Sequence, residues 1–189
     1  MRQTAQSQRL FESNQRGATL IEVLVATTVL MLALLAFTRV IVSSLSATDS
    51  QHEASVARSA AQQMIERLQA TEFESVFALY NEFPDDDPDG PGTAFGKNFQ
   101  VSELSARSGD ADGLVGEVLF PISLDSNGLL DELHRGPYFG TPRDLNGDGL
   151  VDGLLPAGEY KLLPVLVRLE WRGTSGPSKL ELRTLLADY

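Results

Sequence analysis

Residues 17–38 read GATLIEVLVATTVLMLALLAFT and form a long apolar run near the N-terminus. From Ala18 to Thr38 the run contains one charge, Glu22, and Arg39 ends it. As a helix rising about 1.5 Å per residue, this run spans roughly 30 Å, the hydrocarbon thickness of a bilayer. The preceding residues, 1–17, carry three arginines and one glutamate, and positively charged flanks stay cytoplasmic. Residues 18–39 are therefore predicted to form a transmembrane helix, with the chain after Arg39 exported.

Two common kinds of N-terminal segment fit this run less well. A secretory signal peptide has about 7–15 apolar residues followed by a small-residue cleavage site, whereas this run is longer and no Ala-x-Ala-like site with a clear break follows it. A plain membrane anchor accounts for the length but not for Glu22. A carboxylate inside the bilayer costs about 2.5–3.5 kcal/mol, so Glu22 requires a partner of opposite charge.

The ten residues GATLIEVLVA at 17–26 closely resemble the class III signal of type IV prepilins. The resemblance implies that a prepilin peptidase removes residues 1–17 as a leader peptide, cutting between Gly17 and Ala18, and that Ala18 is then N-methylated. It also implies that Glu22 pairs with the N-terminal amine of a neighbouring subunit during assembly. A glycine lets a protease approach the backbone closely, and opposite charges in a low-dielectric bundle attract strongly. Ala18 departs from the family, since most members have Phe or Met there.

The chain after the apolar run is predicted to continue as an amphipathic helix over residues 40–80. This segment contains no proline or glycine and is rich in alanine, glutamine, glutamate and arginine. Apolar residues recur at spacings of three and four or their multiples, at Val40, Ile41, Leu45, Val56, Ala60, Met64 and Leu68. We expect this stripe to pack on the protein's own sheet.

Residues 81–189 are predicted to form an exported, loop-rich β-sheet domain. Residues 81–98, with three prolines, three glycines and four aspartates, have the composition of a loop. Strands are predicted at 99–104 and 117–120, and a hairpin at 160–171 and 178–186, with Val165, Val167, Leu169 and Trp171 on one side. The fold class is α+β, a long N-terminal transmembrane and amphipathic helix packed on a small antiparallel sheet. This is the pilin-like layout, and the final hairpin resembles that of PilV-type minor pilins.

A second motif, D-x-N-x-D-G-x-x-D, occupies residues 144–152. It resembles the start of EF-hand and dockerin calcium loops, which would use oxygens of Asp144, Asn146, Asp148, Leu150 and Asp152. The twelfth position of such a loop takes a bidentate acid, but here it is Leu155. Another segment would therefore have to complete the site, and the candidates are Asp125, Asp131, Glu132 and Glu159. A glycine–aspartate turn without an ion explains the same residues, and both alternatives stay open.

Composition narrows the classes of function. The net charge of −11 and pI of about 4.5 argue against direct nucleic-acid binding. The absence of cysteine excludes disulfides and thiolate metal sites, and two histidines, His52 and His134, are too few for a multi-histidine centre. The sequence contains no G-x-S-x-G, H-E-x-x-H or P-loop motif. We therefore expect no enzyme activity and no required cofactor, with calcium as the only candidate ion.

These observations together predict a minor pilin or pseudopilin subunit of a type IV pilus or type II secretion pseudopilus. It would sit in the inner membrane with a cytoplasmic N-terminus and a periplasmic or extracellular C-terminal domain. Its expected partners are prepilin peptidase, other pilin or pseudopilin subunits, the inner-membrane assembly platform and, before assembly, membrane lipid. The insertions at 81–98 and 125–159 favour a specialised minor subunit, while pilus, secretion and competence systems stay undistinguished. The alternative is a single-pass membrane-anchored exported binding protein or enzyme that keeps residues 1–17.

Overall fold

The computed structural model describes residues 19–123 and 128–188, and the chain divides into two compact units, 1–45 and 46–189. The predicted leader, the Gly17–Ala18 cleavage site and Asp125 lie outside the described residues. Helix α1 (Leu20–Ala70) is long and apolar enough to cross a membrane. In the first unit its large apolar side chains are exposed, as at Leu30 (59%) and Phe37 (64%). The bounds of the predicted transmembrane helix, 18–39, stay a prediction, because α1 continues without a break past Arg39.

In the second unit α1 buries a narrow stripe against the sheet. The buried residues are Ala57, Ala61, Met64 and Leu68, spaced four, three and four apart. Such spacing keeps them on one helix face, and the two alanines let the sheet approach closely. Of the predicted stripe, Met64 and Leu68 are buried, and Val56 and Ala60 are half-buried beside the core. Val40, Ile41 and Leu45 are exposed, so the prediction that they pack on the sheet is wrong.

The helix expected over 40–80 is two helices. α1 ends at Ala70, and α2 (Phe73–Tyr80) starts after a two-residue break. At the break, the Thr71 N–H donates to the carbonyls of Arg67 and Leu68 at 3.1 and 3.3 Å, and the Thr71 hydroxyl also donates to Arg67 O at 2.9 Å. A threonine that bonds back to its own helix in this way offers the backbone an alternative to continuing it. The change of direction turns Val76 and Phe77 of α2 fully into the core.

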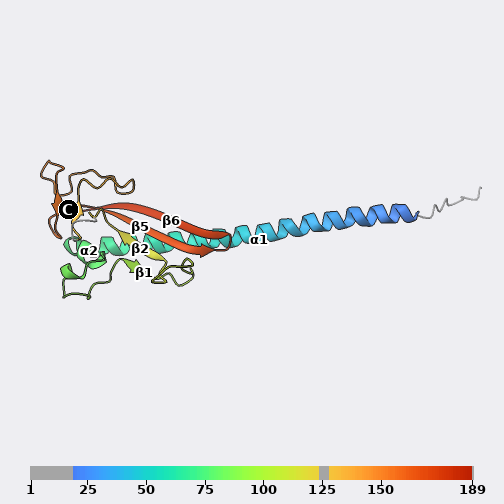
Figure 1. Ribbon diagram of the computed structural model, residues 1–189, viewed down its shortest axis with the longest axis horizontal. Coiled ribbons are helices and arrows are strands. Elements are labelled where there is room, and N and C mark those ends of the chain that lie inside the picture. Colours follow the sequence, from blue (N-terminus) through green and yellow to red (C-terminus); the bar gives the residue numbers. More distant parts are fainter. Residues whose placement is uncertain (1–18, 124–127, 189) are drawn as a thin grey trace, which may run out of the picture. The chain divides into compact units, whose positions relative to one another are not determined.

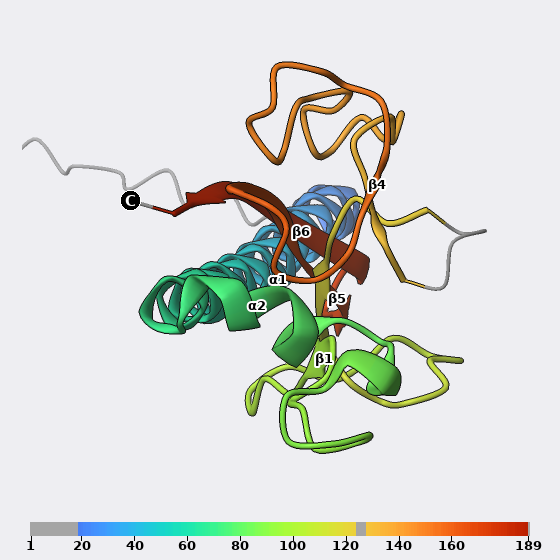
Figure 2. The same ribbon diagram turned by 90° about the vertical axis from the view of Figure 1, so that its left-hand side faces the viewer.

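The core sheet has four antiparallel strands in the order β1–β2–β5–β6, as Figure 1 shows. They are β1 (Asn98–Phe99), β2 (Gly116–Leu119), β5 (Leu162–Gly173) and β6 (Gly176–Ala187). Helices α1 and α2 lie on one side of β5, as the end-on view in Figure 2 shows. The predicted inward residues of β5 (Val165, Val167, Leu169 and Trp171) are all buried there. The α+β layout predicted from the sequence is therefore confirmed.

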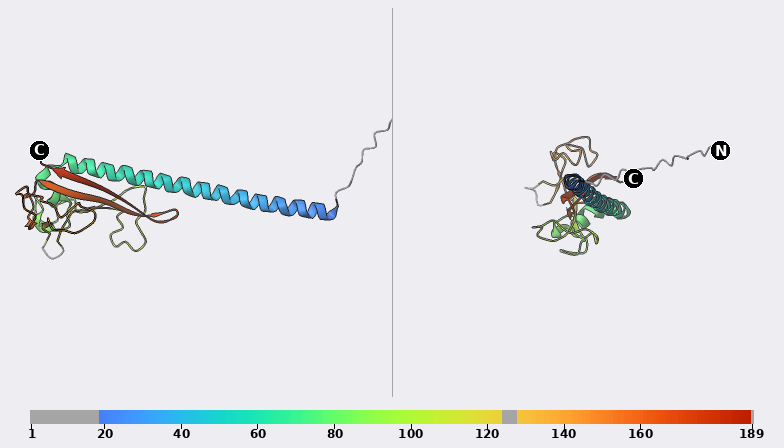
Figure 3. Two further views of the ribbon diagram at one scale, coloured as in Figure 1. Left: turned by 90° about the horizontal axis from the view of Figure 1, so that it is seen from above. Right: turned by 90° about the vertical axis from the view of Figure 1, so that its right-hand side faces the viewer.

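The final hairpin is longer and tighter than predicted. Its register runs from Leu162 opposite Ala187 to Gly173 opposite Gly176, so only Thr174 and Ser175 form the turn. The predicted strands left residues 172–177 as the turn. Gly173 and Gly176 instead belong to the strands and form the last register pair. The hairpin lies alongside the second-unit part of α1, as Figure 3 shows.

Two shorter features complete the second unit. β3 (Leu130–Asp131) and β4 (Leu154–Leu155) form a separate two-stranded sheet, and a 3₁₀ turn, η1 (Pro84–Asp86), lies in the predicted 81–98 loop.

The strand predicted at 99–104 is wrong after Phe99. The chain turns there, and Leu104 N–H donates to Val101 O at 3.1 Å. Val101 and Leu104 are both buried, so their burial comes from a turn over the core.

The tip of the hairpin is fastened to α1 by polar contacts. The Glu53 carboxylate accepts hydrogen bonds from the backbone N–H of Thr174 (3.0 Å), from its hydroxyl, and from the Trp171 indole N–H (3.3 Å). The Thr174 hydroxyl, with Trp171 and against partial desolvation, holds the pKa of Glu53 below its ordinary value. The hydroxyls of Ser46 and Ser50 also lie 3.2 and 3.1 Å from that of Ser175. The hairpin thus runs from the start of the second unit, near Ser46, towards the end of α1.

Candidate functional site

Glu22 lies in the first turn of α1. Its backbone N–H donates to the carbonyl and hydroxyl of Thr19 at 3.0 and 3.3 Å, so Thr19 caps the start of the helix. The partial positive charge at a helix start favours a carboxylate in this position. Among the described residues no ion pair includes Glu22. The described residues therefore supply no cationic side chain that pairs with the Glu22 carboxylate.

The helix surface around Glu22 is apolar and exposed. Its neighbours Leu20, Ile21, Val23 and Leu24 are between 52% and 84% exposed. A continuous apolar helix surface of this kind is stable in lipid or against other helices, not in water. The single carboxylate is therefore placed where a cation on a neighbouring molecule would both neutralise it and fix the register of the contact.

The calcium-like motif folds into a tight loop whose side-chain oxygens accept backbone hydrogen bonds. Asp144 accepts the N–H groups of Gly147 (2.6 Å) and Gly149 (2.8 Å), and these bonds, against slight desolvation, lower its pKa, with Gly149 the largest cause. Asn146 Oδ1 accepts the Asp148 N–H at 3.0 Å. Asp148 Oδ1 accepts the Leu150 N–H at 2.7 Å.

Asp144, Asn146 and Asp148, three of the predicted ligands, thus each accept a backbone hydrogen bond within this loop. Within the described part of the chain, however, no group of three His, Cys, Asp or Glu side chains is placed to hold a metal ion. Calcium binding by this loop stays a prediction.

Glu132 ties this loop to the two-stranded sheet. It is fully buried, and its carboxylate accepts the N–H groups of Leu145 (2.7 Å) and Asp152 (3.2 Å). Its own backbone N–H donates to Gly153 O, and its carbonyl accepts the Arg143 N–H. Glu132 is thus one of the four candidate acids that contacts the loop. Its carboxylate binds the backbone N–H groups of Leu145 and Asp152, near the two ends of the loop. Asp131 instead accepts the Leu133 N–H at 2.9 Å, and Glu159 is exposed.

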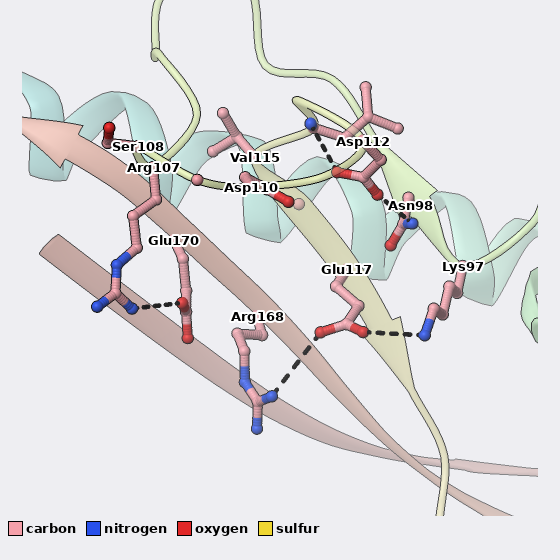
Figure 4. A pocket seen from close by; sticks show the side chains of 13 residues that line it. Lys97, Asn98, Arg107, Ser108, Asp110, Asp112, Val115, Glu117, Arg168 and Glu170 are labelled. Carbon is pink, nitrogen blue, oxygen red and sulfur yellow. Dashed lines mark hydrogen bonds and ion pairs between the residues drawn. The ribbon is translucent and has the colours of Figure 1, made fainter. Parts of the chain in front are cut away.

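A polar cleft of about 550 Å³ lies over β2 and β5, as Figure 4 shows. Arg168 and Glu170 alternate with buried residues of β5, so they point away from the core. Glu117 lies 3.3 Å from Lys97 and 3.7 Å from Arg168, and Glu170 lies 3.5 Å from Arg107. Partial burial alone would lower the pKa of Lys97, but Glu82 and Glu117 together raise it. Each of these five ionic side chains thus has at least one partner of opposite charge, and this favours a structural network over a reaction centre.

Comparison with known proteins adds one result. The family model for the prokaryotic N-terminal methylation motif matches residues 13–38. No curated protein and no solved structure matches the chain. The matched segment includes the predicted cleavage site, Glu22 and the apolar run up to Thr38, and so confirms the resemblance on which the prediction was based. Residues 13–38 therefore carry the prokaryotic N-terminal methylation motif, the class III signal that is typical of type IV pilin-like proteins.

Proposed function

We propose that the chain is a minor pilin or pseudopilin, processed by prepilin peptidase between Gly17 and Ala18 and N-methylated at Ala18. The mature subunit would remain in the inner membrane by one helix, with its second unit on the periplasmic or extracellular side. It would then enter a type IV pilus or type II secretion pseudopilus through that helix. The arginine count supports its membrane orientation: three arginines precede the apolar run, whereas Arg39 alone directly follows it.

The observation that carries this proposal is the single carboxylate of Glu22 in the first turn of an exposed apolar helix. In a bundle of such helices, Glu22 would attract the N-terminal amine that cleavage creates on a neighbouring subunit. Both charges leave water together, so each offsets part of the cost of burying the other. The loops that interrupt the second unit at 81–97 and 132–153 support a specialised subunit over a bulk one.

Substitution at Glu22 tests the assembly step. Glu22→Gln keeps the side-chain shape and removes the charge, so it should insert into the membrane as well as the wild type but fail to enter filaments. Glu22→Asp, the control, keeps the charge and should retain partial incorporation. The measurement is the share of the protein found in sheared filaments against the membrane fraction. Wild-type incorporation of Glu22→Gln would refute charge pairing as the assembly signal.

Intact-mass analysis tests processing. A chain that begins at Ala18, methylated, only when prepilin peptidase is present would support the proposal, and Gly17→Val should abolish that product. Asn14→Val serves as the control because it makes a similar change outside the cleavage site. A chain that keeps residues 1–17 in every case would instead favour a membrane-anchored exported protein with no filament role.

A further inference from the structure

The two edges of the core sheet differ greatly in length. β1 ends one edge after two residues, whereas β6 forms the other edge over twelve. At about 3.3 Å per residue, β6 presents an edge of roughly 36 Å. An unpaired strand edge can bind another strand, and β6 is neither short nor covered by a strand among the described residues. The charged side chains beside this edge restrict which strand can bind to it.

The hydrogen-bonding groups of β6 that point outward can be identified from β5. Glu170 and Arg172 donate their backbone N–H groups to Val115 and Ser105, away from β6. In an antiparallel ladder the residue opposite such a position also turns its backbone outward, and the pattern alternates along the strand. The partner of Glu170 is Lys179, so the central part of the free edge is formed by Lys179, Glu181, Arg183 and Leu185, with Pro177 and Ala187 at its ends. Over the described residues, this edge has no neighbouring strand and no backbone hydrogen bond of its own.

Side chains beside the edge give it a chemical character. On the face towards α1, Leu180 and Leu182 pack against the core but stay only half-buried. Next to the end of β6 is a hollow of about 320 Å³, formed by Leu68, Phe73 and Val76 of the helices with Leu185 and Leu186. An additional strand would cover the two leucines and could place one apolar side chain in this hollow.

The opposite face of the edge carries an unmatched positive charge. Glu181 is already engaged by Arg168 (3.1 Å) and Lys179 (2.8 Å). Arg183 donates only to the carbonyl of Pro137 and lies 5.2 Å from the centre of the Tyr138 ring. Within the described residues it has no carboxylate partner. A strand that carries an acid opposite Arg183 would therefore be favoured, although the chain itself is strongly acidic.

We propose that the free edge of β6 binds an extended segment of a different protein by strand addition. The bound segment would be apolar on the side that faces α1 and acidic beside Arg183. Backbone hydrogen bonds would provide affinity, and the hollow near Leu68 would select one apolar side chain. This surface lies entirely in the second unit and does not depend on the filament role.

A second copy of the chain fits this edge poorly. Two β6 edges paired antiparallel would set the second units in opposite directions, because β6 runs from near Ser46 to near Leu68. Residue 46 of each copy, seven residues beyond Arg39, would then lie at opposite ends of the pair. Pairing the same edges in parallel turns one copy over and sets its charged face beside Leu180 and Leu182 of the other. A different polypeptide meets neither obstacle.

Hydrogen exchange tests the proposal on the full chain in detergent micelles. The probe is a capped peptide of about ten residues in which valine alternates with glutamate, and the control is the same peptide with a central proline, which cannot add to a strand. The alternating peptide should slow exchange at the outward amides of Lys179, Glu181, Arg183 and Leu185 by at least about tenfold. The amides of the intervening residues already bond to β5 and should not change.

Two variants make the test specific. Gln69→Trp should fill the hollow without removing a core contact and so weaken peptide binding at least about tenfold, whereas Gln63→Trp makes the same change outside the hollow and should not. No slowing with the alternating peptide at millimolar concentration would overturn the proposal. Protection of the outward amides without peptide, if it rises with protein concentration, would overturn it in favour of a second copy.

Discussion

Glu132→Gln tests whether the buried carboxylate holds the 143–153 loop in place. In the wild type both carboxylate oxygens accept backbone N–H groups, from Leu145 and Asp152, at full burial. A glutamine amide keeps one acceptor and turns an NH₂ group towards the second N–H. One bond to a charged acceptor, worth about 1.5–3 kcal/mol, is lost, while removing a buried charge recovers part of its desolvation cost.

The expected net loss is about 2 kcal/mol of unfolding free energy. For a unit of this size, about 2–4 °C of melting temperature corresponds to each kcal/mol, so the midpoint should fall by roughly 6 °C. Thermal unfolding of the full chain in detergent, followed by circular dichroism, measures the shift. Glu159→Gln is the control because it makes the same change at an exposed side chain. A Glu132→Gln midpoint at or above that of the wild type would refute the anchoring role.

Further predictions concern the packing of α2, the hairpin tip and the candidate calcium loop. Tyr160→Phe deletes a hydroxyl that donates to Phe73 O at 2.9 Å, so chemical denaturation should show a loss of about 1 kcal/mol, and unchanged stability would contradict this anchoring of α2. Ionised Glu53 has a lowered pKa, so its stabilisation is present above the ordinary glutamate pKa and is lost as pH falls through the lowered one. The difference in melting temperature between wild type and Glu53→Gln should therefore shrink as the pH falls below the ordinary glutamate pKa, and a constant difference would show that ionisation is irrelevant. If the 144–152 loop binds calcium, about 1 mM calcium should raise the melting temperature of the wild type but not of Asp148→Ala, and equal responses would favour the ion-free turn.

The sequence predicts the parts of the fold that depend on long, regular patterns. The apolar run, the helix through Met64 and Leu68, and the alternation from Val165 to Trp171 each extend over several turns or residue pairs, and the structure agrees with them. The break at Thr71 gives a weaker signal, because neither proline nor glycine marks it. The strand predicted at 99–104 fails because a turn over the core can bury apolar residues at similar spacing.

The candidate sites also differ in how far the local sequence predicts them. The motif around Glu22 is a local sequence signal, and the family match at residues 13–38 confirms it. The loop at 144–152 is also local, and its Asp144, Asn146 and Asp148 each accept a backbone hydrogen bond within it, while their role as ligands stays a prediction. By contrast, the anchoring contacts of Glu53 and Glu132 join segments 121 and 13 residues apart, and nothing in the neighbouring sequence specifies their partners.

The fastening of the hairpin tip also determines how the second unit responds to tension. Thr174 and Ser175 are joined to α1 around Ser46–Glu53, and the other end of the hairpin packs near Leu68. Because β5 and β6 run alongside this length of helix and are attached to it near both ends, a pull along α1 is shared between the helix and the hairpin. The hairpin therefore braces this part of the helix against stretching and bending.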